Sequence, residues 1–192
     1  KQTAEGKIRE LLQEAFSGAR VFQGGGNEIL GNDLQAMTLE AANNALQRLY
    51  PQFHIADHAG WETVLKKAQN GAPDALKSVG DEGEPAKNPV CKAILAFIAG
   101  GKKGTDIRKH FDGANYGWSK DAIEGGVQVL LVAGLIRAHD EKGQTIDPKD
   151  LERRDIGKTL FKVESATVSA GQRIQIRKVL QKVGLTAKQG EE

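Results

Sequence analysis

The tripeptide Gly157-Lys158-Thr159 matches the end of a Walker A phosphate-binding loop. In such a loop, backbone amides and the lysine hold the phosphates of a nucleotide, and the pattern needs a glycine five residues before the first residue of the tripeptide. Glu152 stands at that position, where its carboxylate would repel phosphate, and a strand-like run follows where a helix is required. We therefore predict a turn that enters a strand, without a nucleotide site.

Three other groups could do chemistry but lack the partners that the chemistry needs. The glycines at 24–26 lack the strand-to-helix context of a phosphate loop, so we predict a flexible turn. His54 and His58 would share one face of a helix, as metal ligands can, but no third ligand is in register. Cys91 starts a predicted apolar helix, where free cysteines are usually buried. The sequence thus predicts no catalytic residue, metal site or cofactor in this chain.

Composition narrows the class of protein. The 192 residues are 39% hydrophobic and 27% charged, which is ordinary for a soluble globular protein. The single cysteine cannot form an internal disulfide, which indicates a reducing, cytoplasmic setting. No apolar run approaches the roughly 18 residues of a membrane span, so we expect no membrane contact. The chain begins with lysine rather than methionine, and we expect an internal fragment of a longer protein.

The elements that would position these residues fall into four regions. Residues 1–79 form a mostly helical region, with helices expected at 3–16, 38–50 and 60–69 and a short one at 73–79. Thr38 is the expected N-cap of the second helix, in which Leu39, Leu46 and Leu49 belong to the apolar stripe. Residues 80–89 combine glycine, proline and charge with almost nothing apolar, which predicts a linker.

Residues 90–150 follow the order of a winged helix-turn-helix. We expect a helix at 90–99, a short helix at 105–111 capped by Thr105, a longer helix at 119–133 and a hairpin of strands at 135–139 and 144–146. Residues 151–192 add a strand at 159–168 and a helix from Ser169 that packs on this module. The predicted fold class is mainly α with small antiparallel β-structure.

A winged helix often places its third helix in the major groove of DNA. The residues expected to face outward on that helix are Lys120, Asp121, Glu124 and Gln128, of which two are acidic and one is basic. The net charge is only +2, although residues 151–192 hold nine basic and five acidic side chains. Protein contact and DNA contact therefore both stay open. The candidate DNA-contact residues are Lys102, Lys103, Arg108, Lys109, Lys120, Arg153, Arg154, Arg173 and Arg177.

Four stretches of the sequence resemble one protein family. They are ARVFQGGGNEI at 19–29, ALQRLYPQF at 45–53, the run NPVCKAILAFIAGGKKGTDIRKHF with its continuation to residue 138, and IGKTLFKVESATVSAGQRIQIRKVL at 156–180. These phrases resemble the large P-loop ATPase of bacterial BREX phage-defence systems, of the BrxC/PglY type. The resemblance runs along nearly the whole chain, and it depends on these longer stretches of sequence rather than on a short catalytic motif.

The resemblance implies a segment of an antiphage complex that acts on or near DNA. ATP and Mg²⁺ would bind in a separate P-loop region of the parent protein, because no ATPase motif of the family maps to a position here. We expect a non-catalytic, winged-helix-containing interaction segment that mediates assembly with other defence-system proteins. The alternative is a module that contacts the phosphate backbone of double-stranded DNA.

Overall fold

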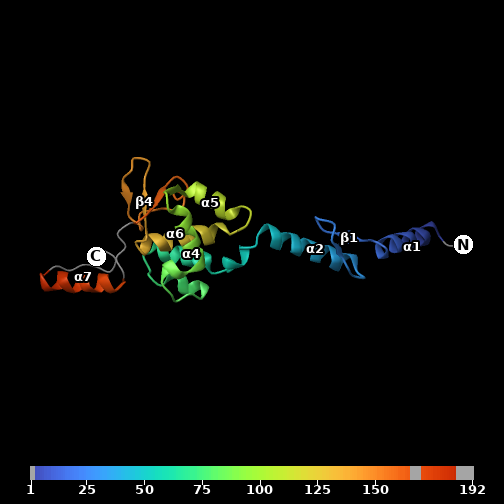
Figure 1. The fold of residues 1–192 in the computed structure, drawn as a ribbon, viewed down its shortest axis with the longest axis horizontal. Helices are drawn as coiled ribbons and strands as arrows, with labels where there is room; N and C mark the ends of the chain where they lie inside the picture. The colour runs from blue at the N-terminus through green and yellow to red at the C-terminus, as the bar shows by residue number, and fades with distance from the viewer. Residues whose placement is uncertain (1–2, 165–169, 185–192) are drawn as a thin grey trace. The chain divides into compact units, whose positions relative to one another are not determined.

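The structure, a computed structural model, describes residues 3–164 and 170–184. Its elements are mainly helices, with two small antiparallel sheets, which confirms the predicted fold class at this level. The chain divides into two compact units, Lys1–Pro51 and Gln52–Glu192 (Figure 1). This boundary lies before the predicted linker at 80–89, and residues 52–79 belong to the second unit.

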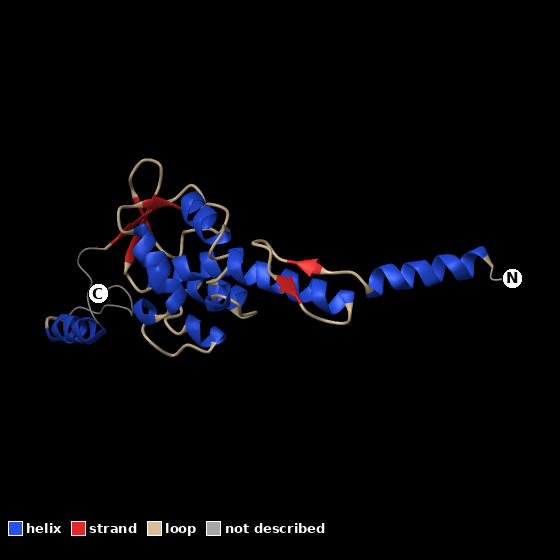
Figure 2. Cartoon of the chain, turned by 45° about the vertical axis from the view of Figure 1, so that its right-hand side comes forward, coloured by secondary structure: helices blue, strands red, loops and turns tan. Residues whose placement is uncertain are grey.

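The first unit has a β-hairpin packed on a helix. Its elements are α1 (Ala4–Ser17), β1 (Val21–Phe22), β2 (Glu28–Ile29) and α2 (Leu34–Leu49). The antiparallel strands lie alongside α2 (Figure 2). The prediction that Thr38 caps the second helix is wrong: Asp33 is the N-cap, and its carboxylate accepts from the N–H groups of Gln35 and Ala36. An aspartate can satisfy two of the free amides that begin a helix, and here it does so five residues before Thr38.

Few side chains of the first unit are buried. None of the residues of α1, all of which the structure describes, is buried. On α2 the face that holds the hairpin contains Met37, which is 7% exposed. The predicted apolar stripe lies elsewhere on the helix, and its leucines Leu39, Leu46 and Leu49 are 47–61% exposed. The unit therefore presents apolar helical faces to its surroundings.

The second unit contains most of the helices and a larger sheet. Its elements are η1 (Phe53–Ile55), α3 (Trp61–Gln69), η2 (Ala75–Val79), η3 (Pro85–Lys87), α4 (Pro89–Ile98), β3 (Lys102–Lys103), α5 (Gly104–Asp112), α6 (Lys120–Val132), β4 (Ile136–His139), β5 (Thr145–Ile146), β6 (Leu160–Val163) and α7 (Ala170–Lys182). Residues 165–168 of the predicted last strand and the predicted capping residue Ser169 lie outside the described residues. The packing of the C-terminal helix on the module stays a prediction.

The core of this unit forms around α6. All ten residues from Ala122 to Leu131 are buried, and α3 and α4 both pack on this helix. Two consecutive glycines in α6 allow that approach. A Cβ on Gly125 would lie 3.3 Å from a ring carbon of Trp61 on α3, and one on Gly126 would lie 2.7 Å from Cδ1 of Ile94 on α4. Glycine weakens a helix by about 1 kcal/mol relative to alanine, and close packing on two sides offsets that cost.

The sheet has the strand order β3-β6-β4-β5, with every neighbouring pair antiparallel. The predicted hairpin is confirmed, because Ala138 of β4 pairs with Ile146 of β5. The last of these strands, β6, lies between β3 and β4, although residues 140–159 separate it from β4 in the chain. One face of the sheet is buried: Ile136, Ala138 and Phe161 are at most 2% exposed.

Three predicted helix boundaries show how local and tertiary contacts compete. Ser119 caps α6 as predicted, since its hydroxyl accepts from the N–H of Ala122. Gly134, the predicted stop, has a φ of 68°, a left-handed conformation that favours glycine. Thr105 is not the cap of α5, which begins at Gly104. The N–H of Gly104 donates to the carbonyl of Thr159, so a residue distant in sequence fixes this helix start.

The predicted linker at 80–89 is folded. Asn88 is 6% exposed and caps α4 by accepting from the N–H groups of Val90 and Cys91. Its amide nitrogen donates to Asp81, 2.7 Å away. The helix η3 packs on both α4 and α6. Glycine and charge thus mark a capped turn against the core of the second unit, rather than a boundary between domains.

Candidate functional site

The Gly157-Lys158-Thr159 tripeptide lies in the turn before β6, as the sequence predicts. Nζ of Lys158 lies 2.8 Å from a carboxylate oxygen of Asp155. The hydroxyl of Thr159 donates to the backbone carbonyl of Asp155 at 2.9 Å, and Thr159 is 1% exposed. Lys158 and Thr159, which would bind a nucleotide in a complete Walker loop, therefore form contacts within the turn itself.

The two histidines near the start of the second unit have structural surroundings. His54 belongs to the short helix η1, and Nδ1 of His58 accepts from the N–H of Gly60 at 2.9 Å. A Cβ on Gly60 would lie 2.1 Å from the carbonyl oxygen of Ser78, so the chain passes very close to η2 here. Among the described residues, no three His, Cys, Asp or Glu side chains are grouped as a metal site requires.

Cys91 lies in the core, with none of its surface exposed. Its thiol points to the carbonyl of Gly126, with Sγ 3.9 Å from the oxygen. Burial raises the pKa of Cys91 to about 12, and the negative charge of Asp81 acts in the same direction. A thiolate is the reactive form of cysteine, so this thiol is chemically quiet at neutral pH.

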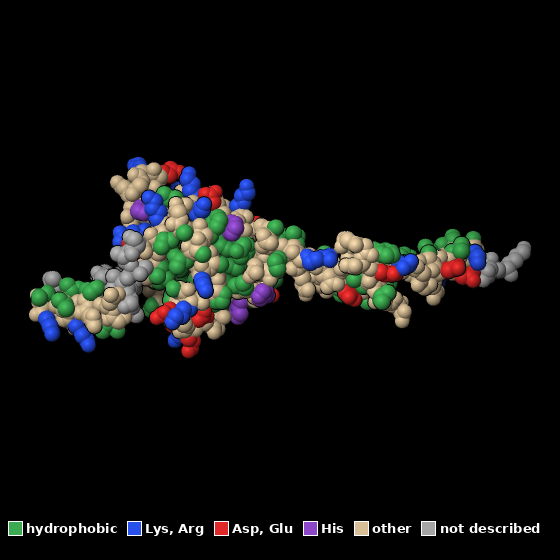
Figure 3. Space-filling view, in the orientation of Figure 1, with side chains coloured by type: hydrophobic (Ala, Val, Ile, Leu, Met, Phe, Trp, Pro, Cys, Tyr) green, Lys and Arg blue, Asp and Glu red, His purple; other side chains and the backbone are tan. Residues whose placement is uncertain are grey.

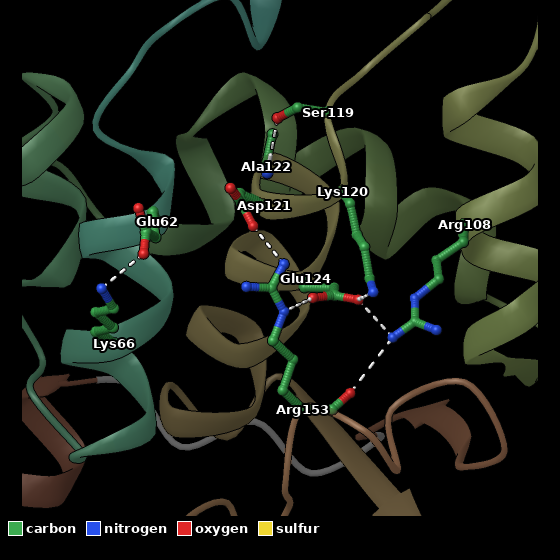
Figure 4. A network of polar contacts seen from close by, with 9 residues as sticks. All are labelled: Glu62, Lys66, Arg108, Ser119, Lys120, Asp121, Ala122, Glu124 and Arg153. Atoms are coloured by element: carbon green, nitrogen blue, oxygen red, sulfur yellow. Dashed lines mark hydrogen bonds and ion pairs between the residues drawn. The ribbon is translucent and has the colours of Figure 1, made fainter.

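A cluster of charged side chains in the second unit surrounds Glu124 on α6. Its side chain is wholly buried, yet it is an acid, and three basic groups approach it (Figure 4). Arg108 of α5 forms an ion pair with one carboxylate oxygen, and Nε of Arg153 donates to the other at 2.5 Å. Nζ of Lys120 lies 3.8 Å away. We call Glu124, Arg108, Arg153, Lys120 and Asp121 the α6 ion cluster.

Arg153 joins both acids of the cluster. Its guanidinium donates to Asp121 as well as to Glu124, and its backbone carbonyl lies 3.4 Å from Nη2 of Arg108. The pKa of Arg153 is raised: burial acts to lower it, but the hydrogen bond to Asp121 and the charge of Glu124 outweigh that effect. The cluster holds the segment before β6 against α5 and α6, and the opposed charges compensate for desolvation.

A second contact of that segment covers α6 farther along the helix. The amide of Gln128, a residue with no exposed surface, donates to the carbonyl of Pro148 at 2.6 Å. Leu151 and Ile156 of the same segment are buried, at 2% and 1% exposed. The prediction that Glu124 and Gln128 face outward is therefore wrong. The chain between β5 and β6 lies over this face of the helix.

The nine candidate DNA-contact residues are distributed over several elements of the second unit. Arg108 and Arg153 belong to the α6 ion cluster, and Nζ of Lys102 lies 5.3 Å from the ring centre of Phe97. Arg154 forms an ion pair with Glu152 at 2.8 Å. Lys103, Lys109 and Lys120 are exposed, whereas Arg173 and Arg177 belong to α7.

Sequence reasoning missed a cluster of aromatic side chains. The rings of Phe97 and His110 stack with centres 4.0 Å apart, and those of Phe111 and Trp118 stack at 4.7 Å. The indole N–H of Trp118 donates to the carbonyl of Gln52 at 2.9 Å. The signal was present as four aromatic residues within about twenty positions, but their meeting depends on how α4, α5 and the loop before α6 fold together.

One open pocket lies beside the β4–β5 hairpin. It is lined by Asp140, Glu141, Lys142, Ile146, Asp155, Lys158 and Thr159. Asp140 already accepts from the N–H groups of Lys142 and Gln144, and Asp155 is paired with Lys158. The ion pair lowers the pKa of Asp155 through its hydrogen bond with Lys158. The charges of Asp140, Asp155 and Lys158 are therefore already engaged in contacts that stabilise the two turns bordering the pocket.

No family model, no curated protein and no solved structure matches this chain. None of the helices in the described residues is both long and apolar enough to cross a membrane.

Proposed function

We propose that this chain is a non-catalytic, winged-helix-containing segment of a BREX antiphage P-loop ATPase that mediates protein assembly in a cytoplasmic defence complex. The order α4, β3, α5, α6, β4, β6 supports the winged-helix interpretation, because such modules follow three helices with a hairpin. The position of β6 between β3 and β4 supports it too, with residues 140–159 as an elaborated wing. ATP and Mg²⁺ would act in another region of the parent protein.

The observation that carries the assembly function is the exposed apolar surface of the first unit. On α1, Ile8, Leu11, Leu12 and Phe16 recur at helical spacing and are 51–59% exposed. The leucines of the α2 stripe are exposed to a similar degree. Single exposed apolar residues are ordinary, but rows of them along two helices are typical of surfaces that another protein covers.

The structure weakens the DNA alternative in the form that uses the third helix. A recognition helix must present side chains to base edges in the major groove. Here the middle of α6 is buried, and the arginines nearest to it already pair with Glu124. Breaking those pairs to reach phosphate would leave a buried carboxylate unpaired, which is costly. Protein contact is therefore the function that the geometry supports best.

Reconstitution with other components of a BREX complex tests the assembly proposal. Leu11→Glu combined with Leu46→Glu places charges on the exposed stripes without opening a buried core. The matched control, Gln13→Glu with Gln47→Glu, adds the same charges at exposed polar positions of the same helices. We expect wild type and control to co-elute with partners in size-exclusion chromatography, also at high salt, because apolar contacts are poorly screened. The leucine variant should elute alone.

Equal elution of the leucine variant and wild type in the partner complex would show that the apolar stripes do not hold it. Failure of wild type to join any BREX complex would overturn the assembly proposal as a whole.

A further inference from the structure

The outward face of the four-stranded sheet is basic. Neighbouring residues of a strand point to opposite faces. On β4, Ile136 and Ala138 are buried in the core, so Arg137 belongs to the other face. On β6, Phe161 is buried, and Lys162, which pairs with Arg137, is exposed.

A second row on the same face lies two residues farther along β4 and β6. Leu160 of β6 pairs with Lys103 of β3 on one side and with His139 of β4 on the other. Lys103 is exposed and His139 is half-buried. The basic sheet face, as we call it, consists of Lys103, Arg137, His139 and Lys162. Figure 3 shows Lys and Arg side chains on the surface of the second unit, with acidic and polar side chains among them.

This arrangement opposes the stability of the sheet. Arg137 and Lys162 are direct cross-strand neighbours with like charges, and such pairs are destabilising. Glu164 relieves part of the repulsion, since it forms an ion pair with Arg137, whose side chain stays 60% exposed. Within residues 3–164 and 170–184, no ion pair of Lys103 or Lys162 is seen. Their charges are available to an external anion.

We propose that the basic sheet face binds the phosphate backbone of duplex nucleic acid, independently of base sequence. Strands lie about 4.8 Å apart, so four basic groups on three strands fall within roughly 10 Å of each other. A regularly charged polyanion can meet several of them at once, and each neutralised phosphate releases counterions. The proposed contact is with the backbone, because Lys and Arg neutralise phosphates whatever the base sequence.

This surface is separate from the apolar stripes that carry the proposed function. It lies in the second unit, and three of its residues were outside the candidate set drawn from the sequence. The two proposals can therefore be tested separately. A failure to bind DNA would not change the result of the leucine experiment, and a failure to assemble with partner proteins would not change DNA binding by the basic sheet face.

Fluorescence anisotropy with a labelled duplex of arbitrary sequence tests the proposal, with salt varied at each protein concentration. The variant is Lys103→Gln with Lys162→Gln. The side chain of Lys103 makes no capping hydrogen bond to α5, so neither change removes a structural contact seen here. The control is Lys67→Gln with Lys77→Gln, which removes two exposed charges from α3 and η2. Circular dichroism confirms that both are folded.

For wild type we expect the logarithm of affinity to fall with the logarithm of salt at a slope of about −3, as for three or four phosphate contacts. The sheet variant should lose about two units of that slope, and the control should keep it. Equal slopes for sheet variant and control, or no binding of wild type at low salt, would overturn the proposal. So would tighter binding to poly-glutamate or to anionic lipid vesicles than to the duplex.

Discussion

At the scale of single residues, Glu124 has the environment least expected from its type. Acids are almost never fully buried unless they are paired. Arg153, Arg108 and Lys120 supply that pairing from three parts of the chain, and Arg153 also binds Asp121. Sequence reasoning placed these acids on a solvated helix face, because a charged residue without known partners is most often exposed.

Glu124→Gln should destabilise the protein by roughly 2–4 kcal/mol. Two guanidinium groups would lose their counter-charge, and breaking buried pairs costs about 3–5 kcal/mol, less where the partners contact water, as Arg108 and Arg153 do. The matched change Glu62→Gln removes an exposed pair with Lys66 (Figure 4) and should cost under about 0.5 kcal/mol. Urea denaturation measures both. Equal effects of the two changes would contradict a structural role for the α6 ion cluster.

The thiol of Cys91 should make stability fall at high pH. Its ordinary pKa is 9.0 and burial raises it to about 12, so between these values the unfolded chain loses a proton that the folded chain keeps. The thiol's contribution to stability is thus complete below about pH 9 and is lost between pH 9 and 12, at about 1.4 kcal/mol per pH unit. Comparing wild type with Cys91→Ala isolates this thiol from other groups. A difference in stability that stays constant from pH 8 to pH 10 would refute it.

At the scale of elements, the positions of the helices and the hairpin were largely predictable from the sequence, but which of their faces are buried was not. The spacing of Ile123, Val127 and Leu130 predicts an amphipathic α6, and the cap at Ser119 fixes where it begins. The structure instead buries the whole middle of the helix. Its second face is covered by α3 and by residues 148–156, which lie far away in sequence, so no local pattern reveals them.

Gly104 should be intolerant of a side chain, although it begins a helix. A Cβ there would lie 1.8 Å from the carbonyl oxygen of Ile156, which is backbone and cannot rotate away. Gly104→Ala should therefore lower stability by about 1–3 kcal/mol, as forced overpacking does, and lower the melting temperature. Gly100→Ala is the control, because nothing lies within 4 Å of its Cβ position. Equal melting temperatures of the two variants would show that α5 does not pack closely against the backbone at Ile156.

At the scale of the whole molecule, the two units differ in how they are stabilised. Described by itself, the first unit buries only Ile29 and Met37 among its described hydrophobic residues. The second contains a continuous core in which Trp118, Phe111 and Phe161 are among the largest buried side chains. Composition alone gave no sign of this difference, since apolar residues recur along both units.

Hydrogen exchange should therefore separate the units. Because α6 is buried and capped, its amides should exchange only through global unfolding. The free energy of opening calculated from their protection factors should therefore approach the free energy of unfolding. Amides of α1 should exchange orders of magnitude faster, since none of its side chains is buried. Mass spectrometry of peptic fragments measures both. Equal protection of α1 and α6 in the isolated chain would contradict this picture.

The sequence by itself determined the secondary structure of most elements, the cap at Ser119, the stop at Gly134 and the incomplete Walker pattern, because each depends on residues within a few positions of one another. Only the tertiary structure decided which faces are buried, where the units divide and which charges meet. Glu124 and Arg153 are 29 residues apart, and Lys103 and Lys162 lie on β3 and β6, which pair directly although they are far apart in sequence. Such contacts depend on how distant segments pack, which local propensity does not encode.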